Sequence, residues 1–416
     1  MPKEDIGFQE AYQLTIQNIQ PLDAEKVLFS DLVGRILAED VKAKVDCPPM
    51  DSSIKDGYAV LSVDVEQASL ENPRTLKVIG RVAAGEKTNI SLTSGVAVKV
   101  MAGAALPKGT QAVVSQEFTR QRGDEVQVFI DAEPGRNILF KGSDVKAGRV
   151  ILSKGQRLRP SRVGFLASAG LDSARVYRRS RVAVIATGSE VLGPGQPTSP
   201  RKIFASNLVN IGAWLKSFGI KVKTAVVEDR EEEITQTIIN HINWADAILT
   251  SGGAWKGERD MVVKILDRMR WHKIYHRVRM GPGKAIGFGL LRKKPIFCLP
   301  GGPPSNEMAF IQLALPGILR LGGSREPPFP FIKANCTMAL TGQADWTQFI
   351  YARLNKVDEK ILVEPISLKS RLQGMADASS IICIPERQNR LEKNQLIDVQ
   401  LLNSEDLMHP FPTPLT

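Results

Sequence analysis

Glycine-containing loops stand directly after apolar, strand-like runs in the second half of the chain. They are Thr187-Gly188-Ser189-Glu190, Ser251-Gly252-Gly253 and Pro300-Gly301-Gly302-Pro303-Pro304-Ser305, and Gly281-Pro282-Gly283-Lys284 adds a cation in a fourth loop. Glycine lets a backbone approach an anion closely, and free amides at the start of a helix bind phosphate. A single Gly-Gly loop is usually only a turn. Four such loops at one edge of a sheet favour a phosphate-bearing ligand.

Several acidic residues stand in or beside turns that contain glycine or proline. A turn carboxylate usually caps the local backbone, and for each residue alone this is the more common explanation. Beside a phosphate site, the same carboxylates can hold a divalent cation that bridges to phosphate oxygens. The acids in such turns are Asp56, Asp144, Glu190, Asp229 and Asp260, the last of them three residues after Gly257.

The charge of the chain is concentrated near the same loops. The sequence has 55 Lys and Arg against 44 Asp and Glu, a net charge of +11, and residues 181–323 carry +9 of it. The excess indicates an anionic ligand or only a solvated basic face. Arg277, Arg279 and Lys284 enter the fourth loop, where anion binding and a solvated face are about equally favoured. A nucleic-acid partner fits less well, because aromatic residues make up only 6% and no RNA-binding motif is present.

Composition restricts the class of protein further. The 416 residues are enough for several domains, and no apolar run approaches the length of a membrane span. The polar N-terminus lacks the apolar core of a signal peptide, and the four cysteines lie far apart, so we expect a reduced, cytoplasmic protein. His272 and His276 stand four residues apart, but the alternation around them favours a strand over a metal site.

A sheet is needed to bring the loops to one edge. Strand-like and helix-like segments alternate through residues 181–323, which predicts a mostly parallel, doubly wound sheet. Ligands bind such sheets outside the carboxyl ends of the strands. The expected strands are 181–187, 222–227, 247–250, 274–278, 286–290 and 296–299. The expected helices begin at Ser206 as a cap, at Glu231, at Asp260 and at Ser305 as a cap, the last being kinked near its end by Pro316.

The rest of the chain is expected to form three further parts. Residues 1–46 with 142–180 should form a helical, linking domain, with helices over about 6–19, 25–32 and 161–169. Short β-like runs separated by Pro and Gly predict an inserted β domain over 47–141. A proline-rich linker then leads to a small C-terminal β domain over 324–416, with strands at 349–354 and 381–384. Residues 181–323 form the α/β domain of this multidomain α/β fold.

The loops also resemble those of a known family. In chain order the matching segments are Met50–Ala59, Lys99–Gly109, Gln116-Glu117, Gly135–Ile138 with Gly142–Asp144, Ala186–Glu190, Ser206-Asn207, Ser251–Gly253 with Gly257 and Asp260, Pro282–Lys284, and Leu299–Gly301 with Pro303 and Ser305. This ordered set is similar to the molybdopterin molybdenumtransferases, the MoeA group to which the E domain of gephyrin belongs.

The resemblance implies an enzyme of molybdenum cofactor biosynthesis. Such an enzyme inserts molybdate into adenylylated molybdopterin and releases AMP, with Mg²⁺ or another divalent cation. It is an elongated homodimer whose site lies between the α/β domain of one subunit and the inserted β domain of the other. Other cofactor-biosynthesis proteins or recipient apoenzymes are further expected partners.

The resemblance also assigns roles to residues by position. The catalytic set is Asp56, Glu190, Asp229, Asp260 and Lys284, with Glu190 and Asp260 as metal ligands. The substrate-binding set is Thr187, Gly188, Ser251, Gly252, Gly253, Gly257, Pro282, Gly283, Pro300, Gly301, Pro303 and Ser305.

The chain departs from the family pattern inside these loops. Ser189 replaces an aspartate, Gly281 replaces the first lysine of the fourth loop, and bulky Trp255 stands where the family has a small hydroxyl residue. Lys55, Lys256 and Arg279 are candidates to restore the positive charge lost at Gly281. The departures leave a second hypothesis open, a catalytically impaired relative that acts as a cofactor carrier or partner scaffold. A nucleic-acid binder is the third.

Overall fold

A computed structural model describes residues 3–198, 200–252, 261–367 and 369–403. The chain divides into two compact units. Unit 1 contains residues 1–25 and 177–416, and unit 2 contains residues 26–176. Unit 2 is therefore an insertion near the start of unit 1. Among the described residues, every helix is too short or too polar to cross a membrane.

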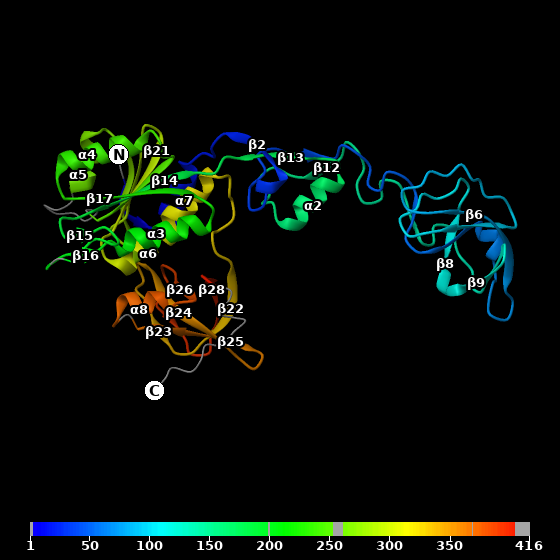
Figure 1. Ribbon diagram of the computed structural model, residues 1–416. Coiled ribbons are helices and arrows are strands. Elements are labelled where there is room, and N and C mark those ends of the chain that lie inside the picture. The colour runs from blue at the N-terminus through cyan, green and yellow to red at the C-terminus, as the bar shows by residue number, and fades with distance from the viewer. Residues whose placement is uncertain (1–2, 199, 253–260, 368, 404–416) are drawn as a thin grey trace. The chain divides into compact units, whose positions relative to one another are not determined.

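The centre of unit 1 is a mostly parallel sheet, as the sequence predicts (Figure 1). The strands β17, β14, β18 and β21 are parallel neighbours, whereas β20 runs antiparallel to both β21 and β19. Strand β1 adds to β19 in parallel. In this order the strands are β17 (Lys221–Val227), β14 (Arg181–Thr187), β18 (Ala247–Ser251), β21 (Lys294–Leu299), β20 (Gly287–Leu291), β19 (His272–Gly281) and β1 (Lys3–Gly7).

Helices cover both faces of this sheet (Figure 1). Alternate residues of β14 enter different cores: Val182 and Val184 pack with one set of helices, and Ala183 and Ile185 with the other. The first set is α1 (Phe8–Gln17), α3 (Ser206–Ser217), α6 (Pro303–Ala309) and α7 (Leu315–Leu321). The second set is α4 (Glu231–Ile242) and α5 (Met261–Arg268).

Two expected helix caps are wrong. Ser206 is the first residue of α3, and Ala205 occupies the cap position without a side-chain bond. Helix α6 begins at Pro303 rather than after Ser305, because proline is favoured in the first turn, where its missing N–H has no intrahelical partner. Residues 303–321 form one continuous helical run of α6, a π-helical turn and α7, and Pro316, where we expect a kink, falls inside this run. It lies in the first turn of α7, after a π-helical turn at Phe310–Ala314 that accommodates the missing N–H.

The strands after residue 330 continue the same sheet through a short pairing of β24 with β19. The expected strands at 349–354 and 381–384 lie within β24 and β26. These C-terminal elements are β22 (Phe331–Cys336), β23 (Leu340–Thr341), β24 (Thr347–Val357), β25 (Lys360–Pro365), α8 (Arg371–Ala376), β26 (Ser380–Ile384), β27 (Arg390–Leu391) and β28 (Leu396–Leu401).

Unit 2 has a β part and a mixed part. The β part is a six-stranded sheet in the order β8 (Ala112–Ser115), β5 (Gly57–Val60), β7 (Val96–Val100), β6 (Arg74–Val82), β10 (Glu125–Val128) and β9 (Thr119–Arg122). The mixed part packs α2 (Pro160–Ser168) against the pairs β2–β13 and β3–β12. These pairs are β2 (Ala24–Leu28) with β13 (Ser173–Tyr177), and β3 (Val41–Lys42) with β12 (Val150–Leu152).

The helix expected over 25–32 is also wrong. Residues 24–28 form strand β2, and Phe29–Asp31 form one 3₁₀ turn. Pairing with β13, which is distant in the sequence, overrides the local preference for a helix. At the N-terminus, Ile6 lies in β1 rather than in the first helix, which spans Phe8–Gln17 only.

Candidate functional site

The loops after β14, β18 and β21 meet at the carboxyl edge of the unit 1 sheet. Ala186 is in register with Ser251, and Ser251 with Leu299, so the three strands end at the same level. The backbone N–H of Gly252 donates to the carbonyl oxygen of Leu299 over 3.2 Å. A Cβ on Gly301 would lie 3.8 Å from the Cα of Gly252. The predicted convergence of these loops on one edge is therefore present in the fold.

Gly252 is required by both its conformation and its surroundings. Its φ of +105° lies in the region that side chains disfavour. A Cβ at this position would stand 2.5 Å from the carbonyl oxygen of Thr187. The absence of a side chain is thus what allows the second loop to pass against the first.

Two asparagines hold Ser251, the last residue of β18. The Nδ2 of Asn207 lies 3.3 Å from the Oγ of Ser251, and the Nδ2 of Asn306 lies 3.0 Å from it. The same two amides donate to the carbonyl oxygens of Gly301 and Pro300 over 2.8 and 2.7 Å. Because the Ser251 oxygen accepts both N–H groups, its own O–H remains to donate to an acceptor such as a phosphate oxygen.

These asparagines were missed as site residues. Asn207 was part of a segment carrying the family resemblance, and Asn306 had no sequence signal beyond its place in the first turn after a Gly-Gly loop. Asn306 is 1% exposed. A buried amide needs hydrogen-bond partners, and here the partners are the loops themselves.

The helix start after β21 offers fewer amides to an anion than the sequence suggests. Pro303 and Pro304 have no N–H, and the N–H of Asn306 already donates to the carbonyl oxygen of Gly302 over 2.8 Å. Within the described residues, the backbone N–H groups of this loop without a recorded acceptor are those of Gly301, Gly302 and Ser305. Side-chain donors must therefore provide more of any anion binding here.

The fourth loop, Gly281–Lys284, packs beside α6. Gly283 has a φ of +118°, and a Cβ there would lie 3.3 Å from the backbone nitrogen of Ala309, the last residue of α6. The ammonium of Lys284 lies 4.7 Å from the ring centroid of Trp346, which directly precedes β24. A cation over an indole face is held by the ring quadrupole. Trp346 was not predicted from the sequence, where nothing links it to Lys284.

The two arginines leading into this loop are engaged elsewhere. Arg277 pairs with Asp5, with Nε 3.3 Å from Oδ1. Arg279 donates to the carbonyl oxygen of Asp5 over 2.6 Å and lies 3.6 Å from a carboxylate oxygen of Glu386. These contacts fasten β1 and a C-terminal loop to β19. For both arginines these contacts favour a structural role over the anion-binding role.

The acids of the predicted set lie on different elements. Glu190 is exposed at the end of the first loop, and Asp229 is exposed after the outer strand β17. Gly253, Trp255, Lys256, Gly257 and Asp260 lie outside the described residues. Within the described ranges, no three His, Cys, Asp or Glu residues gather as a metal site. His272 is exposed and His276 is 3% exposed on one strand, so they do not form the pair considered above.

Asp56 lies in unit 2, in the turn between β4 (Ser52–Ser53) and β5. Its Oδ1 accepts the backbone N–H of Ala102 over 2.7 Å, and its carbonyl oxygen accepts the N–H of Gln116 over 2.9 Å. The side chain is exposed. These bonds fix the position of the carboxylate within the turn.

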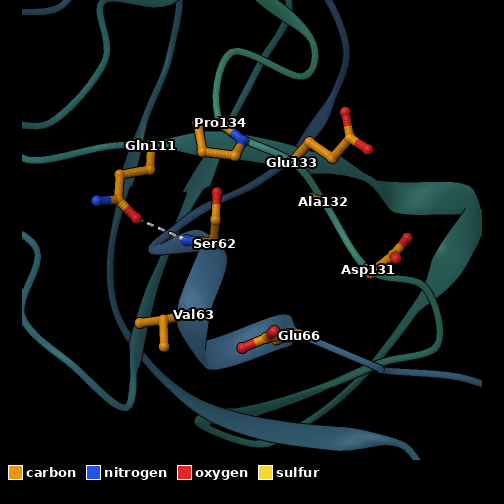
Figure 2. A pocket seen from close by; sticks show the side chains of 8 residues that line it. All are labelled: Ser62, Val63, Glu66, Gln111, Asp131, Ala132, Glu133 and Pro134. Carbon is orange, nitrogen blue, oxygen red and sulfur yellow. Dashed lines mark hydrogen bonds between the residues drawn. The ribbon is translucent and has the colours of Figure 1, made fainter.

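A pocket of about 480 Å³ in unit 2 does not fit an anionic substrate (Figure 2). Its wall contains the carboxylates of Glu66, Asp131 and Glu133, together with Ser62 and Gln111. The N–H of Ser62 donates to the Gln111 side-chain oxygen over 2.9 Å (Figure 2). None of the described residues that form this wall belongs to the predicted site. The negative charge of its three carboxylates would repel phosphate or molybdate.

Known proteins match both the sequence and this arrangement. Residues 6–170 match the family described as the MoeA N-terminal region (domain I and II), and residues 183–320 match a probable molybdopterin binding domain. A putative molybdopterin biosynthesis protein of Methanocaldococcus jannaschii is 32% identical over 93% of this chain and 99% of its own length. The chain belongs to the MoeA family.

Further relatives agree with this assignment. Molybdopterin molybdenumtransferase 2 of Mycobacterium tuberculosis is 32% identical over 91% of this chain and 95% of its own length. The crystal structure of a MoeA protein from Pyrococcus horikoshii matches with a TM-score of 0.82 and 28% identity, covering 95% of this chain and 100% of that chain. The MoeA fold thus extends over nearly the whole sequence, including the C-terminal strands.

Proposed function

We propose that this MoeA-family chain inserts molybdate into adenylylated molybdopterin and releases AMP. The observation that carries the proposal is the convergence of three loops around Ser251 and Gly252, with the Ser251 hydroxyl held by Asn207 and Asn306. Together with the loop amides and Lys284, this edge of the sheet presents donors and a cation to an anion. The substrate is itself an anionic, phosphate-bearing pterin.

The relatives support an enzyme rather than a scaffold. Several proteins named molybdopterin molybdenumtransferase match most of the chain at moderate identity, which places the chain among the transferases of molybdenum cofactor biosynthesis. The carrier or scaffold hypothesis rested on substitutions within the loops. The loops nevertheless keep the close contacts at Gly252 and Gly301 that bring them together.

Individual roles follow from charge and position. Lys284 neutralises phosphate or molybdate, and Thr187, Gly188, Gly283 and the loop at Pro300–Ser305 shape the substrate pocket. Glu190 and Asp260 are proposed to hold Mg²⁺, and Asp229 is proposed to act beside them. Mg²⁺ commonly binds through one or two carboxylates plus substrate phosphates, so the exposed carboxylate of Glu190 fits this mode without a larger protein cluster. A bound Mg²⁺ would neutralise phosphate charge.

The assembly belongs to the same proposal. We propose a cytoplasmic homodimer in which the inserted β domain of one subunit offers Asp56 to the site of the other. We also propose a division into four domains with boundaries near residues 46, 141, 180 and 323, with β1 and α1 packing within unit 1. Cofactor-biosynthesis proteins and recipient apoenzymes are proposed as further partners. Size-exclusion chromatography with light scattering tests the dimer, and a monomer at working concentration contradicts it.

The decisive experiment is AMP release from adenylylated molybdopterin on addition of molybdate. We expect the purified wild-type chain to release AMP, and Lys284→Ala to lower kcat/KM by about tenfold or more because a substrate charge loses its cation. Lys284→Arg, which keeps the charge, is the matched control and should retain more activity. Substrate binding by the wild type without molybdate-dependent AMP release would contradict the catalytic proposal.

A further inference from the structure

Glu307 is a buried carboxylate next to the loop that follows β21. It lies in α6 and is 6% exposed. Its Oε1 accepts the Nδ2 of Asn210 over 2.7 Å and the Nε1 of Trp214 over 2.9 Å. Its Oε2 accepts the hydroxyl of Tyr351 over 2.8 Å. A carboxylate is rarely buried this far unless its oxygens are satisfied, and here three donors satisfy them.

The donors come from two elements that flank the site. Asn210 and Trp214 belong to α3, and Tyr351 belongs to β24. On α3, Asn207 lies three residues before Asn210 and seven before Trp214, so the three side chains share one face of the helix. Asn207 reaches Ser251 and Gly301 from this face. The face of α3 that contacts Glu307 is thus the face that contacts the loops.

Helix α6 begins without a side-chain cap. Its cap residue, Gly302, has no side chain, and Pro303 and Pro304 donate no backbone N–H. The neighbouring residue Asn306 turns toward Ser251 and Pro300, while Glu307 turns toward α3 and β24. The rotation of α6 about its axis therefore determines the contacts of Asn306 and those of Glu307 together.

We propose that Glu307 is a positioning residue for molybdenum transfer. It holds α3 and α6 so that Asn207 and Asn306 keep Ser251 and the Pro300–Ser305 loop in place. Through Tyr351 it also connects this loop to the C-terminal strands. The inference rests on the proposed function in one respect, that these loops bind the substrate.

Another buried carboxylate in unit 1 supplies a matched control. Asp246 is also 6% exposed and also satisfied, by Arg178 and Arg181. It directly precedes β18 and so lies at the amino edge of the sheet, opposite the loops. A substitution at Asp246 disturbs the fold without touching the candidate site.

The test compares Glu307→Ala, Glu307→Gln and Asp246→Asn in the full-length protein. For the folded Glu307→Ala variant we expect the KM for adenylylated molybdopterin to rise by about tenfold, because charged hydrogen bonds that hold the loop are lost. Glu307→Gln should restore most of the affinity, since its amide oxygen can accept from α3 and its amide nitrogen can donate to Tyr351. Asp246→Asn should lower the melting temperature and leave KM nearly unchanged.

A second measurement does not depend on turnover. Hydrogen exchange in peptides covering residues 206–210 and 300–306 should be faster in Glu307→Ala than in the wild type, and unchanged in Asp246→Asn. If a folded Glu307→Ala protein showed unchanged exchange and an unchanged KM, the inference would be overturned. The same would follow if Glu307→Ala and Asp246→Asn changed exchange and KM equally. A wild-type protein without AMP release would overturn the proposed function alone, and the exchange result would still decide the role of Glu307.

Discussion

At the scale of single residues, the site depends on places where a side chain is absent. Gly252 combines a φ of +105° with a carbonyl oxygen that a Cβ would approach to 2.5 Å. Gly302, in the adjacent loop, has a φ of −71° and open space around its Cβ position. The two glycines therefore make a matched pair for testing what the close contact contributes.

We expect Gly252→Ala to lower the free energy of unfolding by about 2 kcal/mol or more, through the unfavourable φ and the clash with Thr187. Gly302→Ala should change it by less than about 1 kcal/mol. Urea titration of both variants measures the difference. Equal stability of the two variants would show that the contact between the first two loops is not tight.

Most residues of the candidate site could be predicted from the sequence. Their loops follow parallel strands, and the carboxyl ends of parallel strands lie at one edge of the sheet. Thr187, Ser251 and Pro300 come together for that reason. Asn306, Glu307 and Trp346 could not be predicted in this way. Their partners lie on other helices and strands, and no local pattern indicates which polar side chain of a buried helix will face a loop.

At the scale of elements, apolar strand-like runs that alternate with helix-like segments predicted the strands of unit 1 and the helices between them. The predicted cap positions and the predicted helix over 25–32 were wrong, because these features depend on contacts with segments that are distant in the sequence. Ala24–Leu28 has a partner strand in residues 173–177 that no local window contains. Pro316 predicted a kink near the end of the helix that follows β21, but the π-helical turn that precedes it at Phe310–Ala314 has no clear sequence pattern.

The entry of β14 and β18 into the sheet is fixed by one charged cluster. The carboxylate of Asp246 accepts hydrogen bonds from both terminal nitrogens of Arg178, each over 2.8 Å, and from the backbone N–H of Arg181 over 2.8 Å. Burial alone would raise the pKa of Asp246, but the hydrogen bonds from Arg178 and Arg181 outweigh it and lower the pKa below the ordinary carboxyl value.

A lowered folded-state pKa means that the ionised form stabilises the protein, so this stability is present above the unfolded pKa, near 4, and is lost as the pH falls through the folded pKa. We expect Asp246→Asn to cost about 3 kcal/mol at pH 7, because two arginines lose their carboxylate. The difference from wild type should shrink below about pH 4. Unfolding titrations across pH 3–7 measure it, and a difference independent of pH would contradict the assignment.

At the scale of the whole molecule, charge is uneven. Residues 181–323 carry +9 of the net +11. Arg277 and Arg279 are paired with Asp5 and Glu386, so part of this charge is neutralised locally. The remaining field still favours the approach of an anionic substrate.

We expect the KM for the pterin substrate to rise several-fold between about 0.05 and 0.5 M salt, since the screening length falls from above 10 Å toward 3 Å. An uncharged osmolyte at equal osmolality is the control for effects on water activity. A KM that does not respond to salt would mean that the basic surface does not act on the substrate.

The first strand of the chain has a consequence for how the protein is made. Strand β1 pairs with β19, whose residues 272–281 leave the ribosome long after residues 3–7. The whole of unit 2 is synthesised between these partners, and its core clusters draw on residues of its own segment. During translation, the inserted unit therefore has its core residues available first, while the N-terminal strand of its host must wait for a partner that has not yet been built.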